Sequence, residues 1–154
     1  TATPRLPTTR TKRAARRPHP ADPAPVAQGQ HECPASARAA VVARVNEARR
    51  AAALQPLTSD AGLGRAAQSR ASAMASANQL SHTGWERVVR RHDDASTIGE
   101  NVAYNYPSAT AVVDAWLRSP GHRANLLGPS FRRIGVGCIV DARARLWWAQ
   151  DFAD

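Results

Sequence analysis

The chain has 154 residues, enough for one domain of ordinary size and too few for two. It is 43% apolar and 21% charged, which is compatible with a packed core, and its formal net charge is +9, with Lys12 the only lysine. No stretch approaches the roughly 20 apolar residues that span a bilayer. The sequence contains no nucleic-acid module and no aromatic-and-basic stacking pattern, so nucleic-acid binding is not expected as the main function.

Residues 1–32 have the composition of a basic, proline-rich tail. They contain six prolines and almost no large apolar residue, and Arg10 to Arg17 carries five positive charges. Such a segment cannot bury enough surface to offset its ordering entropy, so we expect disorder there and a domain over 33–154. The tail either contacts an anionic surface or is a solvated linker. Because the chain begins at Thr1 without Met, we expect a mature secreted form or an expressed fragment.

Two helices are predicted at the start of the domain. Over 36–54 the small apolar residues recur at three- and four-residue spacing, with Ser36 as the expected N-cap and Pro56 as the stop. A second helix is predicted over 59–78, rich in small residues that allow close packing. A short helix over 85–91 is followed by a polar loop, and the whole segment 85–97 is a candidate cover for a cleft.

The second half of the domain changes from helical to strand periodicity. Ser108 is expected to open a helix whose buried stripe includes Trp116 and which ends at Pro120-Gly121. From 134 to 140 apolar residues alternate with other residues, 141–145 has the composition of a turn, and 146–152 is the return strand of a hairpin. Helices first and a hairpin last predict an α+β fold.

Three residues far apart in the sequence are good metal ligands or proton carriers. They are His82 in Ser-His-Thr-Gly, Glu100 in Ile-Gly-Glu-Asn, and His122 in Ser-Pro-Gly-His-Arg-Ala-Asn. Imidazole suits Zn²⁺, Cu²⁺ or Ni²⁺, and a carboxylate can complete the shell. We therefore expect folding to assemble them into one site.

In this order, and with Trp116 just before the last motif, these residues resemble the CAP superfamily. This family comprises the cysteine-rich secretory, antigen 5 and pathogenesis-related-1 proteins, and its module is also called the SCP domain. The likeness runs from about residue 35 to 152 and is closest to the secreted bacterial branch. It implies a three-layer α-β-α sandwich around a mixed, mostly antiparallel sheet, and a secreted, extracellular or envelope-associated protein.

The resemblance also implies a cleft in which two histidines and acidic residues hold a divalent metal in several members. His82 and His122 match the histidines, and Glu100 matches the acidic residue. Animal and plant members commonly carry a second glutamate where this chain has Ser119, and a hydroxyl is a poor zinc ligand. Any metal would therefore need water in its shell, and Asp114 lies on another helix face.

Further residues are expected beside this cleft: Ser119, Asn101, Tyr104 and Trp116. Tyr106 is a candidate for its rim. Trp147 and Trp148 are adjacent on a strand and must face opposite sides, so at least one belongs to the core and the other is a candidate ligand contact.

Cys33 and Cys138 are the only cysteines. In an exported protein such a pair usually forms a disulfide, and neither residue has a partner at metal-site spacing. Two buried free thiols are the alternative.

Two classes of function remain open. The first is a non-enzymatic secreted module that binds a lipid, a cell-envelope component or a partner protein. The second is a metal-dependent hydrolase, a peptidase or cell-wall amidase, in which His82 and His122 hold Zn²⁺ and Glu100 ligates it or activates water. The three residues can also form a purely structural polar network. The sequence leaves open whether the protein is an enzyme, assigns no catalytic residue outside the hydrolase alternative, and does not define an oligomeric state.

Overall fold

In a computed structural model, residues 27 and 29–154 are described. The expectation of disorder concerns mainly residues 1–26, which lie outside the described part. The sheet begins with β1 (His31–Glu32), two residues before the domain start expected at 33. It continues with β2 (Thr58–Ser59), β3 (Ile98–Tyr104), β4 (Arg133–Val140) and β5 (Leu146–Ala153).

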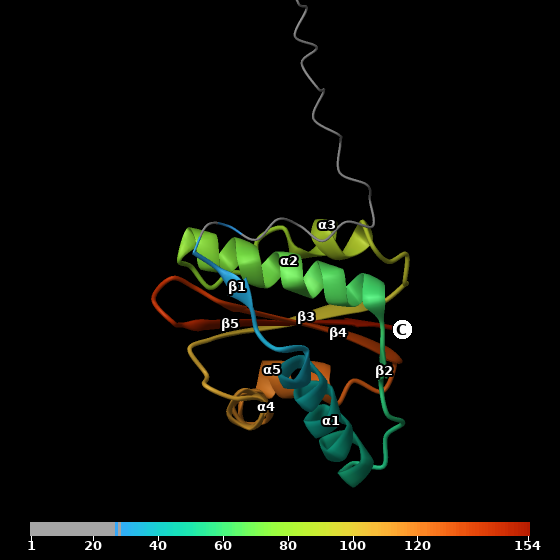
Figure 1. The fold of residues 1–154 in the computed structure, drawn as a ribbon. Helices are drawn as coiled ribbons and strands as arrows, with labels where there is room; N and C mark the ends of the chain where they lie inside the picture. The colour runs from blue at the N-terminus through green and yellow to red at the C-terminus, as the bar shows by residue number, and fades with distance from the viewer. Residues whose placement is uncertain (1–26, 28) are drawn as a thin grey trace, which may run out of the picture.

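The five strands form one mixed sheet between two layers of helices (Figure 1). The order is β1-β4-β5-β3, with every neighbouring pair antiparallel, while β2 lies parallel to β4 on the same side as β1. Helices α2 (Ala61–Ala77) and α3 (Trp85–Arg90) cover one face. Helices α1 (Ala35–Ala51), α4 (Ala109–Arg118) and α5 (Pro120–Leu126) cover the other. The predicted α+β fold and three-layer sandwich are confirmed.

The helix ends follow the local chemistry, and those of α1 differ from the prediction at two points. Asp60 caps α2 by accepting a hydrogen bond from the Leu63 amide at 2.9 Å, a role that was not predicted. Ser108 caps α4 in the same way, and its predicted place at the start of this helix is confirmed. Ser36 does not cap α1, because the helix already begins at Ala35 and the N-cap is Pro34. The end of α1 also precedes Pro56: the chain leaves the helix at Ala52.

Two elements near the site were not predicted. Pro120-Gly121 ends α4 but also opens α5, because proline at the first helical position needs no amide donor. Residues Ile98–Tyr104 form β3 although Glu100 and Asn101 interrupt the apolar pattern, since both faces of this strand are buried. Glu100 therefore lies in a strand and His122 lies on a helix.

The two faces of the hairpin pack against different helices. Trp148 lies in the cluster with α1 and α4, and Trp147 lies in the cluster with α2, so the predicted alternation is confirmed. Both indoles are at most 2% exposed. Both belong to the core, and the prediction that one of them contacts a ligand stays a prediction.

A disulfide joins Cys33 to Cys138, with the Cα atoms 5.3 Å apart, and confirms the predicted pairing. It fixes the chain just after β1 to the neighbouring strand β4. Here the Cys33 amide also donates to the Cys138 carbonyl at 3.0 Å.

Candidate functional site

Glu100 is the centre of a buried polar cluster on the α2 face of the sheet. Its side chain is 1% exposed, and both carboxylate oxygens accept hydrogen bonds from Arg70 of α2, at 2.8 Å from Nε and 3.1 Å from Nη2. This bidentate pair is the strongest geometry that arginine offers a carboxylate. Glu100 is therefore held in place by a full positive charge.

The same guanidinium positions His82. Arg70 donates to the backbone carbonyls of Ser81 and Thr83, which flank His82 in the turn after α2. The Nδ1 atom of His82 then lies 3.0 Å from Oε1 of Glu100, while the imidazole remains 52% exposed. One arginine thus orders both the acidic residue and the loop that carries the first histidine.

Asp151 is a site residue that the sequence did not single out. It lies directly opposite Glu100 in the β3–β5 register, is fully buried, and neither carboxylate oxygen has a hydrogen-bond partner within the described residues. Burial, and then the charge of Glu100, raises the pKa of Asp151 well above its ordinary value. An acidic residue inside the apolar run of β5 is the signal that could have identified it.

On the opposite face of the sheet, two asparagines connect the Gly-Glu-Asn motif of β3 to the Gly-His-Arg-Ala-Asn motif of α5. Asn125 donates to the Glu100 carbonyl at 3.1 Å and to the Asn101 side chain at 2.9 Å. Asn101 is fully buried and donates to the His122 carbonyl at 3.1 Å. These bonds fix α5, and with it His122, against β3.

His122 borders a cavity of about 300 Å³ beside edge strand β3. Burial, and then the charge of His82, lowers the pKa of His122 below its ordinary value, so the imidazole is neutral at neutral pH. The cavity is mainly apolar and holds three of the expected cleft-adjacent residues. Its lining consists of Leu80, Val102, Ala103, Tyr104, Tyr106, Ala115, Trp116, Ser119 and His122.

The other candidates lie elsewhere. Asn101 does not line this cavity, and no residue of the segment 85–97 does either. Asp114 forms an ion pair with Arg44 at 2.9 Å, consistent with its expected position away from Ser119.

The arrangement does not fit a divalent metal. Across residues 29–154 no group of three or more His, Cys, Asp or Glu side chains is placed to hold an ion. The guanidinium of Arg70 occupies both oxygens of Glu100, and its charge opposes a cation there. The zinc site stays a prediction.

The sandwich and its three motifs match a known protein family. The motifs contain His82, Glu100 and His122, and they meet at edge strand β3. The family model "CAP: Cysteine-rich secretory protein family" matches residues 42–152, and the chain belongs to this family.

Relatives are found in several bacteria. The Bacillus subtilis protein YkwD is 31% identical over 118 residues, which are 73% of this chain and 45% of that protein. An extracellular SCP-domain protein of Bacillus anthracis is 25% identical, with a TM-score of 0.71 over 77% of this chain and 40% of its own. An outer surface protein of Borrelia burgdorferi shares the fold, with 20% identity and a TM-score of 0.74 over 80% of this chain and 97% of its own. The chain spans less than half the length of YkwD.

Proposed function

We propose that this chain is a non-enzymatic extracellular module that binds an apolar ligand, such as the acyl chain of an envelope lipid, in the cavity beside His122. The observation that carries the proposal is this mainly apolar cavity of about 300 Å³, a size typical of the lower range of ligand pockets. The polar residues of its lining, Ser119 and His122, with the two tyrosines Tyr104 and Tyr106, are few enough to orient a headgroup without making the cavity hydrophilic.

The state of Glu100 supports binding rather than hydrolysis. A general base needs a free carboxylate within reach of the proton that it removes. Both oxygens of Glu100 are instead bonded to Arg70, one of them also faces His82, and the side chain is 1% exposed. This geometry supports a structural role for Glu100, which contacts Arg70 and His82 and does not line the cavity.

An extracellular location agrees with the extracellular relative from Bacillus anthracis and with the disulfide. Among the described helices, none has both the length and the apolar character for crossing a bilayer.

The test uses decanoic acid below its micellar concentration and the tryptophan fluorescence of the full chain. Trp116 lines the cavity, so we expect a saturable fluorescence change. Ala115 also lines the cavity, and Ala115→Phe should fill it and weaken binding at least about tenfold. The control is Ala124→Phe, at an exposed position of α5 that does not line the cavity.

Equal binding by wild type and Ala115→Phe would place the ligand elsewhere. The absence of any saturable change in the wild type would contradict the apolar-ligand proposal. Folding of each variant is checked by its unfolding transition.

A further inference from the structure

The outer edge of β4 has a gap in its strand pairing. On one side, β1 ends where the Cys33 amide donates to the Cys138 carbonyl at 3.0 Å. On the other side, β2 ends where the Asp60 amide donates to the Ile134 carbonyl at 2.9 Å. Four residue steps, about 13 Å of strand, separate these two contacts. Within the described residues, no strand lies beside Val136, the residue midway between them, on this side.

A side chain from α2 fills part of the gap. The Gln68 amide accepts from the Cys138 amide at 3.0 Å and donates to the Cys138 carbonyl at 3.1 Å, as a residue of a neighbouring strand would. Alternate residues of a strand direct their backbone groups to the same side. The N–H and C=O of Val136 therefore point to the same edge as those of Ile134 and Cys138. Neither group has a hydrogen-bond partner in the part of the chain that the structure describes.

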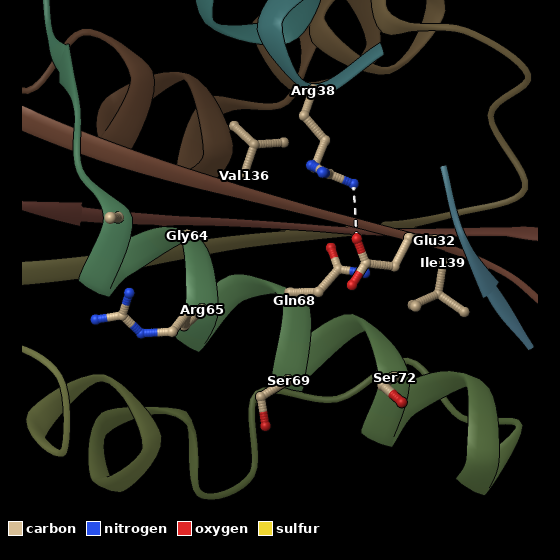
Figure 2. Close-up of a pocket in the computed structure, with 10 residues that line it drawn as sticks. Glu32, Arg38, Gly64, Arg65, Gln68, Ser69, Ser72, Val136 and Ile139 are labelled. Carbon is tan, nitrogen blue, oxygen red and sulfur yellow. Dashed lines mark hydrogen bonds and ion pairs between the residues drawn. The ribbon is translucent and has the colours of Figure 1, made fainter. Parts of the chain in front are cut away.

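This open stretch borders a cavity of about 330 Å³ between α1 and α2 (Figure 2). Gly64 and Gln68 form its α2 side, Arg38 reaches in from α1, and Glu32 and Ile139 stand at the β1 end. A second hollow of about 210 Å³ shares Arg38, Gly64 and Val136 and extends toward Ser59. We call the two together the β4-edge groove.

Two arginines, Arg38 and Arg65, and two acidic residues, Glu32 and Asp60, line the groove. Asp60 forms an ion pair with Arg133 at 3.3 Å, a residue that lines neither hollow. Arg38 donates to Glu32 at 3.4 Å and to the Cys33 carbonyl at 2.8 Å. The charge of Arg38 therefore balances that of Glu32, the one acidic residue that lines the larger cavity. Arg65 forms no ion pair with any described residue, and its Nε is buried without a hydrogen-bond partner among them. The groove thus offers a guanidinium, a backbone donor and a backbone acceptor that no described residue uses.

We propose that the β4-edge groove binds the C-terminal residue of a short peptide. The peptide residue lies beside Val136 as an added strand: its N–H donates to the Val136 carbonyl, and its terminal carboxylate accepts from the Val136 amide and from Arg65. Backbone pairing at a free sheet edge is an established mode of peptide recognition, and a carboxylate complements the guanidinium of Arg65, which forms no ion pair with any described residue. Val136 and Ile139 provide apolar surface for a small side chain. This site is separate from the cavity beside His122, and binding at one does not depend on the other.

The test titrates N-acetyl-alanyl-alanine into the isotope-labelled full chain and follows backbone amide resonances. We expect saturable shifts at Val136 and Arg65, and binding at least about tenfold weaker for the C-terminal amide of the same peptide, because the amide lacks the negative charge. Arg65→Gln should weaken binding of the acid to a similar extent, whereas the exposed Arg50→Gln should not.

Gly64 supplies an obstructing variant with a matched control. A Cβ atom at Gly64 would have no neighbouring heavy atom within 4 Å, so the helix accepts a side chain there. Gly64→Phe should abolish the shifts at Val136, and Gly64→Ala should keep them. The proposal is overturned if the peptide acid causes no saturable shift in the wild type, if the acid and the amide bind equally, or if Gly64→Phe binds as well as Gly64→Ala. Shifts confined to Tyr104 and His122 would also overturn it and assign the peptide to the other cavity.

Discussion

Among the single residues, Asp151 and Glu100 lie opposite each other on the neighbouring strands β5 and β3. Both carboxyl groups are influenced by the charge of one guanidinium, that of Arg70. Arg70 bonds to Glu100 and not to Asp151, which agrees with the raised pKa of Asp151. A neutral Asp151 makes the three side chains electrically balanced inside the protein. This assignment explains how a second buried acid is tolerated beside the first.

The raised pKa of Asp151 gives a pH dependence with a definite sign. The unfolded chain loses this proton near the ordinary value of 3.8, while the folded chain retains it to higher pH. Asp151 therefore makes the free energy of unfolding fall as pH rises from about 4 toward its folded pKa. Asp151→Asn, which keeps the shape and has no proton to lose, should be more stable than wild type at pH 7 by about 1–3 kcal/mol, because only the wild type must take up this proton when it folds.

Urea denaturation between pH 4 and pH 8 checks this prediction. The difference between Asp151→Asn and wild type should shrink as pH falls toward 4, where the folded and the unfolded wild type both hold the proton. Asp94→Asn, at an exposed position, is the control and should follow the wild type at every pH. A destabilised Asp151→Asn at pH 7 would show that Asp151 is ionised and useful in the folded state.

Among the helices and strands, the closeness of α2 to β4 depends on two glycines. A Cβ atom on Gly135 would overlap the backbone of Leu63 and Gly64, and one on Gly137 would overlap the backbone of Ala67. Backbone cannot move aside as the end of a side chain can. The small residues of α2 and these two glycines of β4 therefore allow the helix and the strand to pack closely together.

Gly135→Ala should lower the free energy of unfolding by about 3 kcal/mol or more, because α2 must move away from the sheet. Gly64→Ala is the matched change on the facing helix, where the new methyl group meets nothing within 4 Å. It should raise stability by up to about 1 kcal/mol, since alanine restricts the unfolded chain and favours helix. Urea denaturation of both variants measures the difference; similar effects would contradict the proposed close contact.

Elements with a clean hydrophobic period were predictable from the sequence, and those that build the site were less so. α2, α4 and the β4–β5 hairpin follow their apolar spacing closely. β3 was missed because Glu100 and Asn101 are buried polar residues whose partners, Arg70 and Asn125, come from distant segments. α5 was missed because Pro-Gly is typical of a helix end as well as of a helix start.

The site shows the same division. His82, Glu100 and His122 could be named from their motifs, because each motif is short and local. Arg70 and Asp151 could not, because their roles depend on the register of β3 with β5 and on the position of α2.

In the molecule as a whole, the disulfide closes almost the entire domain into one loop. Cys33 and Cys138 are 105 positions apart, and both side chains are buried. β1 pairs with β4 over only two residues, so the covalent bond is the main restraint on the start of the domain. In the chain-entropy model, a loop of this length stabilises the folded state by about 4–5 kcal/mol.

That amount is large beside the about 5–15 kcal/mol that holds a typical domain folded. Reduction should therefore lower the free energy of unfolding by about 4 kcal/mol, measured by urea denaturation with and without dithiothreitol. The variant Cys33→Ala/Cys138→Ala should be at least as unstable and should not respond to dithiothreitol, which separates loss of the bond from other effects of the reductant. A loss below about 1 kcal/mol would mean that the unfolded chain is already compact enough for the cross-link to add little. A loss near the expected value would make full stability of this domain depend on an oxidising compartment, which agrees with the extracellular location that we propose.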